Sequence, residues 1–346
     1  MSDSMLHRLW FDRGGAAGAA RLGLWPAAAV FRAVVAARNA LYDLGALPVR
    51  PGAIPAIAVG NLTVGGTGKT PVSAWMAGEL ARRGAAPAIV LRGYGGDEPQ
   101  VHERLNPAIP VVVEADRAAG LARARALGAT IAVLDDAFQH RGVTRLADVV
   151  LVSAERGLRG WRMLPAGPFR EPPSALRRAA LVVVTRKTAS AAEAAQVLAG
   201  ATEISGTPGA VVHLEAASIE AAVSGASLPL SAAVGRRVVL ITGVGEPELL
   251  AAQLRRAGAD VELLAFPDHH AFSDAELARA AAEASRGDAL AVCTLKDAVK
   301  VLPRWPGPGP LWYVSQRLTV DQGREHLERL IDAAAAATRS NPPTAG

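Results

Sequence analysis

Short, continuous apolar runs alternate along the first half of the chain with stretches of helical periodicity. Helical patterns lie at 71–83, closed by Gly84, and at 116–127. Buried strands that alternate with helices are typical of a parallel sheet covered on both faces. We therefore predict an α/β fold. The strand-like runs are 56–60, 88–91, 109–113, 130–136, 148–153 and 181–185.

A second, smaller set of the same kind follows, with strand patterns at 237–243, 261–266 and 289–295 and a helix at 246–257. The segment 200–235 is rich in small residues, which suits a linker carrying a strand or two. "PGPGP" precedes a strand at "LWYVS" and a last helix at about 320–336, and the tail "RSNPPTAG" is expected to be disordered. The predicted domains are 1–205, linker strands at 206–235, a smaller α/β domain at 236–305, and a return strand, helix and tail at 306–346.

The N-terminal region contains an uncharged stretch, "LGLWPAAAVF" at 22–31, bracketed by Arg21 and Arg32. It is shorter than the ~20 residues that span a bilayer. One helical stripe gathers apolar residues here, with Arg32 and Arg38 off it and Pro26 in the first turn. The stripe comprises Val30, Val34 and Leu41, with Phe31, Val35 and Tyr42 beside them.

Such a helix can pack on the domain core or lie in a membrane interface, and taken alone the stripe favours core packing. A signal peptide is a third alternative, because "AAA" resembles a cleavage site. The phosphate loop that follows argues against it, since ATP is found in the cytosol.

Composition and charge limit the possible partners. The net charge of +5 over 346 residues suits nucleotides or anionic lipid, and the absence of a concentrated basic run argues against nucleic acid. Cys293 is the single cysteine, which excludes an internal disulfide framework and a cysteine-rich zinc site. A reducing compartment follows.

The stretch "GNLTVGGTGKTP", residues 60–71, has the composition of a phosphate-binding loop between a strand and a helix. Its glycines let main-chain N–H groups converge on an anion, while Lys69 can reach the phosphates and Thr70 can bind Mg²⁺. Thr63 replaces the first glycine of the usual pattern, and a glycine-rich turn with an incidental lysine is the alternative. The predicted nucleotide-binding residues are Thr63, Gly65, Gly66, Thr67, Gly68, Lys69 and Thr70.

Two acidic residues, Asp135 and Asp136, end the apolar run "IAVL". A nucleotide site of this type needs a carboxylate for the metal at the end of a central strand, although a solvated strand end or a helix N-cap would look the same. Gln139 and His140 follow and are expected beside the same site. The chain is thus predicted to be an ATP- or GTP-dependent protein with a P-loop NTPase-type sheet.

Six motifs in order, "GNLTVGGTGKTP", "RGYG", "GDEP", "DDAFQHR", "LPAGPFREP" and "FPDHHAF", resemble the tetraacyldisaccharide 4'-kinase family from about residue 20 to 335. The resemblance implies a two-domain P-loop enzyme using ATP and Mg²⁺. It implies transfer of the γ-phosphate to the 4'-hydroxyl of tetraacyldisaccharide 1-phosphate in lipid A biosynthesis. It also implies a peripheral protein on the cytoplasmic face of the inner membrane, which we expect to be a monomer.

The resemblance assigns Asp97 of "GDEP" as the base and pairs it with His269 of "FPDHH", rather than His270, once the second domain closes. "DHH" alone would instead suggest a polar helix start, because Ser273 and Glu276 form a capping-box pattern. The remaining implied roles are catalytic for Lys69 and Arg92, metal-binding for Thr70, Glu98, Asp135 and Asp136, and substrate-binding for Arg117, His140, Arg170 and Glu171.

Two departures from the family pattern stand out. "RGYG" runs directly into "GDEP", where the family usually carries an insertion, so the loop bearing Asp97 is short. Ala137 replaces a glycine, which would cost on the order of 1 kcal/mol if that position needs a positive φ.

Given the resemblance, the apolar stripe at 30–42 becomes a candidate surface for acyl chains, and interfacial contact is favoured over core packing. The main rival is a P-loop ATPase switch of the partition or metal-insertion type. Those proteins carry a signature lysine where this chain has Val64, which argues against them. A lipid-binding scaffold without activity is a third possibility, but Lys69, Thr70 and Asp97 are all present.

Overall fold

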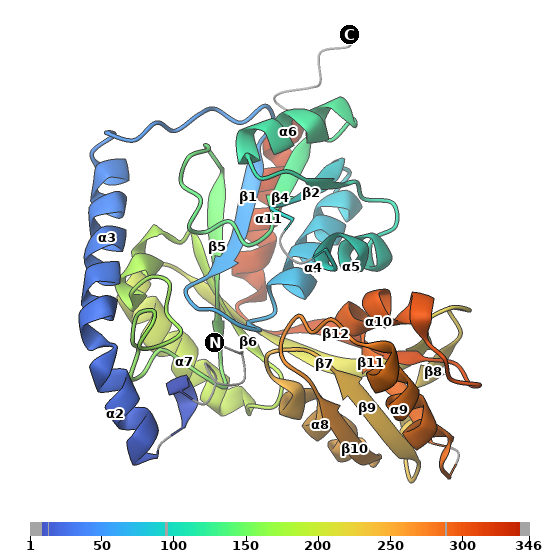
Figure 1. Ribbon diagram of the computed structural model, residues 1–346. Helices are drawn as coiled ribbons and strands as arrows, with labels where there is room; N and C mark the ends of the chain where they lie inside the picture. Colours follow the sequence, from blue (N-terminus) through green and yellow to red (C-terminus); the bar gives the residue numbers. More distant parts are fainter. Residues whose placement is uncertain (1–8, 13, 94–95, 288, 340–346) are drawn as a thin grey trace. The chain divides into compact units, whose positions relative to one another are not determined.

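The computed structural model describes residues 9–12, 14–93, 96–287 and 289–339 (Figure 1). The chain forms two compact units. The first unit comprises Met1–Tyr94, His102–Val212 and Val320–Gly346, and the second comprises Gly95–Val101 and His213–Thr319. The second unit is larger than the predicted domain at 236–305, because it includes most of a long strand on either side and the short segment that bears Asp97.

The first unit contains a sheet with strand order β7-β6-β5-β1-β4-β2-β3, in which the pairs from β6 to β3 are parallel. Strand β1 is buried at every position, as expected for a strand covered on both faces. The strands are β1 (Ala56–Asn61), β2 (Pro87–Leu91), β3 (Val111–Val113), β4 (Ile131–Leu134), β5 (Ala147–Ser153), β6 (Leu181–Arg186) and β7 (Gly209–Ala221).

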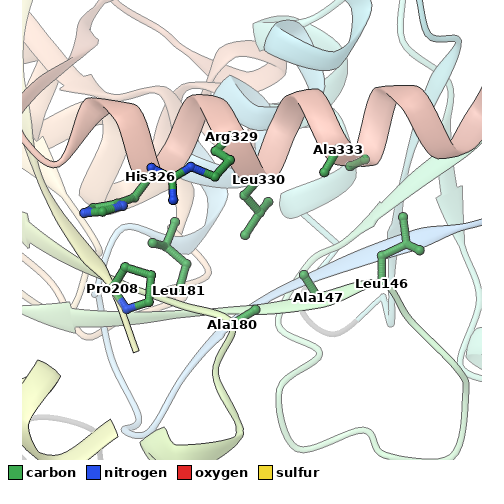
Figure 2. Close-up of a pocket in the computed structure, with 10 residues that line it drawn as sticks. Leu146, Ala147, Ala180, Leu181, Pro208, His326, Arg329, Leu330 and Ala333 are labelled. Atoms are coloured by element: carbon green, nitrogen blue, oxygen red, sulfur yellow. The ribbon is translucent and has the colours of Figure 1, made fainter. Parts of the chain in front are cut away.

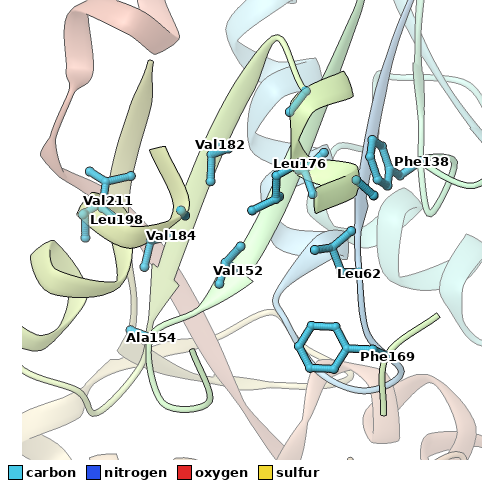
Figure 3. Close-up of a cluster of buried hydrophobic side chains, with 14 of the residues drawn as sticks. Leu62, Phe138, Val152, Ala154, Phe169, Leu176, Val182, Val184, Leu198 and Val211 are labelled. Carbon is cyan, nitrogen blue, oxygen red and sulfur yellow. The ribbon is translucent and has the colours of Figure 1, made fainter. Parts of the chain in front are cut away.

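Helices cover both faces of this sheet. Helices α6 and α7 pack on one face, where a cluster of buried side chains including Phe138, Leu176 and Leu198 lies against β5 and β6 (Figure 3). Helices α4 and α11 contact each other and cover the other face. The helices of the unit are α2 (Gly15–Gly23), α3 (Trp25–Asp43), α4 (Lys69–Arg82), α5 (Glu98–Leu105, entered from the second unit), α6 (Arg117–Ala126), η1 (Pro173–Arg178), α7 (Ala191–Ser205) and α11 (Arg324–Arg339).

The second unit has its own strand order, β10-β9-β11-β12-β7, with β8 antiparallel on β7. Helix α8 packs on one face, and helices α9 and α10 pack with a separate buried cluster. Its elements are β8 (Ser227–Pro229), η2 (Leu230–Ala233), β9 (Arg237–Thr242), α8 (Pro247–Arg256), β10 (Asp260–Ala265), α9 (Asp274–Ser285), β11 (Leu290–Thr294), α10 (Leu295–Val301), η3 (Leu302–Arg304) and β12 (Trp312–Gln322). The predicted α/β fold class is confirmed.

The structure differs from the predicted elements near the C-terminus. The last helix begins at Arg324 rather than about 320, because β12 continues to Gln322. Gly323 separates the two with a φ of +71°, and a Cβ there would overlap the carbonyl oxygen of Gly209. The predicted disordered tail lies outside the described residues from position 340 onward.

The uncharged stretch 22–31 extends over two helices, whereas the apolar stripe at 30–42 lies entirely on α3. Helices α2 and α3 meet at a bend of 51°, and Pro26 occupies the first turn of α3 as predicted. No single helix among the described residues is long and apolar enough to cross a membrane, although this bent pair together has sufficient length and composition. The stripe itself divides: Phe31 and Val35 pack against the cluster of Figure 3, whereas Val30 and Val34 are 65% and 60% exposed.

Candidate active site

The glycine-rich loop lies between the end of β1 and the start of α4. Gly65 and Gly68 have φ values of +107° and +80°, and Gly68 immediately precedes the helix. Thr67 is buried, and its hydroxyl accepts a hydrogen bond from Asn61 Nδ2 at 2.6 Å while its carbonyl accepts one from Thr185 Oγ1 at 3.0 Å. The loop therefore presents its main chain at a helix N-terminus in a fixed shape, which suits a bound phosphate.

Thr63, in place of the first glycine, needs no unusual backbone. It forms an antiparallel bridge with Phe169, and the next N–H, of Val64, donates to the carbonyl of Pro168 at 2.8 Å. The segment before the paired glycines is thus extended and held by the 168–169 chain. An extended conformation is open to any residue, so the departure at Thr63 is compatible with the loop.

Two cationic side chains, Lys69 and Arg170, contact the carboxylate of Asp136 beside this loop. Arg170 donates to both carboxylate oxygens, at 2.8 and 3.1 Å, and Lys69 Nζ lies 3.8 Å from Oδ1. Burial alone would raise the pKa of Asp136, but Lys69, Arg170 and Arg117 hold it well below its ordinary value. The side chain is nevertheless 42% exposed, so this carboxylate can meet a ligand.

Asp135, by contrast, is buried and fully engaged. Its Oδ1 accepts from Ser73 Oγ at 3.0 Å and from the N–H of Asp136 at 2.9 Å, and its Oδ2 lies 2.9 Å from His102 Nε2. Arg117 Nη2 donates to its carbonyl at 3.1 Å. Asp135 therefore ties α4, α5 and β4 together and fixes the main chain that bears Asp136.

The strain expected at Ala137 lies one residue earlier. Asp136 has a φ of +47°, and it is one of two non-glycine residues with positive φ in the described part of the chain, the other being His269. Ala137 is buried without such strain, so the alanine costs nothing of the kind the sequence suggested. Gln139 lies beside the site as predicted, since its Nε2 donates to the carbonyl of Asn61 at 2.9 Å.

The predicted substrate residues fall into two groups. Arg117 and Glu171 are buried: Glu171 accepts from Asn39 Nδ2 at 2.8 Å and from Arg178 Nη2 at 3.0 Å, which holds α3 to the 171–178 segment. His140 lines a cavity of about 130 Å³ together with Arg117. Arg92 is exposed just after β2. Burial and the charges of Arg117, Arg92 and Arg38 lower the pKa of His140 to about 4.

Asp97 and His269 lie together in the second unit. The distance from His269 Nδ1 to Asp97 Oδ1 is 3.6 Å, and Asp97 is 2% exposed. Burial raises the pKa of Asp97, but His269 and the charges of Lys296 and Lys300 outweigh it and hold the pKa below its ordinary value. Asp97 raises the pKa of His269 in turn.

Both residues lie in the second unit, so their contact is made within one unit, and the expected closure of the second domain stays a prediction. The choice of His269 over His270 fits the contacts. His270 stacks on Phe266 and its Nε2 lies 3.1 Å from the carboxylate of Glu276. Glu276 and Ser273 also form the capping box of α9, so the predicted helix start is confirmed.

Comparisons with known proteins identify the family. The model of the family described as tetraacyldisaccharide-1-P 4'-kinase matches residues 20–104 and 95–336. This chain belongs to the tetraacyldisaccharide 4'-kinase family. A relative with that name from Anaeromyxobacter sp. (strain Fw109-5) is 38% identical over 96% of this chain and 97% of its own length. Another from Halorhodospira halophila is 35% identical over 85% of this chain and 88% of its own length.

A solved structure extends the likeness to three dimensions. The crystal structure of LpxK from Aquifex aeolicus in complex with ATP matches with a TM-score of 0.71 and 26% sequence identity. It covers 91% of this chain and 99% of that one. The resemblance drawn from the six motifs is thus confirmed, and the chain is an enzyme of a kinase family. The junction between "RGYG" and "GDEP", where the family usually carries an insertion, falls between residues 95 and 96, and residues 94–95 lie outside the described residues.

Several residues around the phosphate loop were not identified from the sequence. Ser73 and His102 reach the site through hydrogen bonds to Asp135, and Lys187 Nζ donates to the carbonyl of Gly66 at 2.6 Å. Each is a common residue type without a motif of its own. The spacing of Ser73, four residues after Lys69 on α4, is the one available signal, since i and i+4 share a helix face.

A cavity of about 390 Å³ lies elsewhere in the first unit, between α11 and the amino ends of β5 and β6 (Figure 2). Leu146, Leu181 and Leu330 line it, with His326 and Arg329 on the helix. The phosphate loop follows the carboxyl end of β1, which runs parallel to β5. The cavity therefore lies at the opposite edge of the sheet from the phosphate site, where α/β enzymes do not usually bind substrate.

Proposed function

We propose that this chain transfers the γ-phosphate of ATP to the 4'-hydroxyl of tetraacyldisaccharide 1-phosphate. The observation that carries the proposal is the charged cluster at the phosphate loop. There, Lys69 and Arg170 both form ion pairs with Asp136 beside the N-terminus of α4. The family membership of nearly the whole chain supplies the acceptor. The similar solved structure from Aquifex aeolicus is described as a complex with ATP, which supports the donor.

In the first unit, the main-chain N–H groups of the loop and Lys69 hold the phosphates of ATP. The loop fits such a ligand because its glycines leave room for an anion and Gly68 opens α4. Lys69 also stabilises the charge that develops on the transferring phosphoryl group. Arg92, which is exposed at the end of β2, is a second candidate for that charge.

Thr70 and Asp136 are the residues that would hold Mg²⁺. The hydroxyl of Thr70 lies in the first turn of α4, and Asp136 offers a partly exposed carboxylate, whereas both oxygens of Asp135 are engaged by Ser73 and His102. Asp135 then positions its neighbour. A bound Mg²⁺ supplies neutralisation of charge on the phosphates. Glu98, in the first turn of α5, keeps its assignment as a metal ligand as part of the proposal.

In the second unit, Asp97 accepts or orients the proton of the acceptor hydroxyl, with His269 as its partner. A sugar hydroxyl is a weak nucleophile, so a carboxylate held ionised beside it favours attack. The lowered pKa of Asp97 keeps it in that form near neutral pH. His140 and Arg92 are the better candidates for direct contact with substrate, because Arg117 and Glu171 are buried and already hydrogen-bonded.

The membrane role rests on α3. Its exposed residues include Trp25, Val30, Val34 and Leu41, while Phe31 and Val35 hold the helix to the core. An anchored helix with an apolar outer face can enter a membrane interface and meet the acyl chains. We place the protein on the cytoplasmic face of the inner membrane, where ATP is present, as a monomer.

The test is transfer of labelled γ-phosphate from ATP to tetraacyldisaccharide 1-phosphate in detergent micelles, with Lys69→Ala and Asp97→Ala measured in parallel. The exposed Arg159 supplies a control variant, Arg159→Ala, which should keep full activity. Transfer by the native chain that both site variants lose supports the proposal. No transfer, together with ATP hydrolysis that survives Asp97→Ala, would refute it in favour of an ATPase switch.

A further inference from the structure

Two lysines of α10 face the Asp97–His269 pair within the second unit. Lys296 and Lys300 are four residues apart on this short helix, so they lie on one face. Neither has a role in the six motifs of the family resemblance. Their surroundings indicate a specific task.

The helix that carries them is fixed to the end of β9 by a buried carboxylate. Asp297 is fully buried, and its Oδ2 accepts from Thr242 Oγ1 at 3.0 Å, from the N–H of Gly243 at 3.2 Å and from Thr294 Oγ1 at 2.7 Å. These three bonds leave α10 little freedom to move relative to the strand. The two lysines are therefore presented from a rigid base.

Lys300 lies between two carboxylates. Its Nζ is 3.4 Å from Asp297 Oδ1 and 3.5 Å from Asp97 Oδ2. The other oxygen of Asp97, Oδ1, faces His269 Nδ1 at 3.6 Å. Each oxygen of the buried carboxylate thus faces one cationic or ionisable group at ion-pair distance, and neither oxygen accepts a hydrogen bond from the described residues.

Lys296 makes the shorter contact, 2.9 Å from its Nζ to His269 Nε2. An ammonium group has donors and no acceptor, so the ring nitrogen in this contact must supply the lone pair. The proton of a neutral imidazole then resides on Nδ1, the atom that faces Asp97. The main chain of His269 is held as well, because its N–H lies 3.0 Å from Asp268 Oδ1 and 3.1 Å from the carbonyl of Gly243.

We propose that Lys296 and Lys300 are positioning residues for the Asp97–His269 pair. Lys296 fixes the imidazole in the Nδ1–H tautomer and directs that N–H at Asp97, and Lys300 holds the second oxygen of the carboxylate. The four side chains form one row, Lys300, Asp97, His269 and Lys296, in which cationic or donor groups flank the carboxylate. This inference rests on the proposed function, in which Asp97 acts on the acceptor hydroxyl.

The tautomer can be measured without any substrate. Long-range ¹⁵N–¹H spectra are recorded on the full-length chain labelled with ¹⁵N-histidine. The signals that disappear in His269→Gln are those of the His269 ring. We expect this ring, in the native chain, to carry its proton on Nδ1 and none on Nε2. Lys296→Met should lose this preference and show exchange between both tautomers, whereas Lys296→Arg and Lys300→Met should keep it.

Kinetics give the second readout. Lys296→Met and Lys300→Met should each lower kcat at least about tenfold with the KM for ATP within about twofold, since neither contacts the nucleotide loop in this assignment. Lys296→Arg should recover most of the loss. Arg279→Met, an exposed cation on α9, is the matched control and should match the native chain.

An unchanged His269 tautomer in Lys296→Met would overturn the assignment. If kcat fell in that variant while the tautomer stayed the same, Lys296 would act directly on substrate. Lys296→Leu, which also lacks a donor, replaces the methionine variant if that one does not fold. Failure of the proposed function has a different signature: the native chain would transfer no phosphate to the lipid, while the ring spectra would still decide the tautomer.

Discussion

Arg170 donates a hydrogen bond to each carboxylate oxygen of Asp136, from Nη1 to Oδ2 at 3.1 Å and from Nη2 to Oδ1 at 2.8 Å. The same Nη2 also donates to Asn61 Oδ1 at the end of β1. Asp136 has a left-handed backbone conformation, which persists only where surrounding contacts hold it, and Arg170 supplies two of these contacts. The arginine therefore links the strand that opens the phosphate loop to the acid proposed as metal ligand.

Arg170→Lys should lower kcat/KM for ATP by about 10- to 100-fold, because an ammonium group contacts one carboxylate oxygen where the guanidinium fork contacts two. The check is steady-state kinetics with labelled ATP, beside Arg159→Lys as an exposed control. Equal activity of the two variants would show that the fork has no bearing on the site.

Ala137→Gly should reduce the free energy of unfolding by about 0.5–1 kcal/mol. The sign is opposite to the sequence-based expectation, because the positive φ belongs to Asp136 and glycine would only add freedom to the unfolded chain. Urea unfolding of the two proteins measures the difference. A glycine variant more stable than the native chain would show that position 137 is strained after all.

The elements and the loop were predictable because their signals are local. Buried strands such as 56–60 and 88–91 appear as continuous apolar runs, and the glycines before Lys69 mark a main-chain site without any knowledge of the fold. The start of the last helix was predicted too early because the local signal there is ambiguous. "RLTVDQG" fits either a helix or a strand, and pairing within the sheet decided for the strand.

The supporting residues of the site could not be predicted, because their roles arise only from tertiary contacts. His102 acts through Asp135, and Lys300 through Asp97, across long stretches of sequence. A lysine or histidine on an amphipathic helix is ordinarily a surface residue, so the pattern alone gives no reason to select it. The resemblance supplied Asp97 and His269 but not the groups that hold them.

His140 should make the protein less stable as the pH falls from about 6.5 to 4. Its pKa is about 4 in the folded chain against 6.5 in the reference state, so the unfolded chain takes up the proton first and is favoured over that interval. The loss should be about 1–3 kcal/mol, allowing for partial exposure of the ring. Urea unfolding at pH 7 and pH 4.5 measures it.

His140→Gln supplies the comparison for that pH dependence, since the amide does not titrate. The difference between native and variant stability should shrink toward the acid end of the interval and level off below the folded pKa. A pH dependence identical in the two proteins would assign the acid sensitivity to other groups.

Val30→Asp combined with Val34→Asp should release the protein from vesicles of phosphatidylethanolamine and phosphatidylglycerol. Both side chains are exposed on α3, and each buried valine contributes about 1–2 kcal/mol to partitioning, so binding should fall at least about tenfold. Val35 is unsuitable for this test because it packs on the core. Val223→Asp, at a valine 81% exposed in the second unit, is the matched control. Cosedimentation unchanged in the α3 double variant, with kinase activity in micelles retained, would remove this helix from the membrane contact.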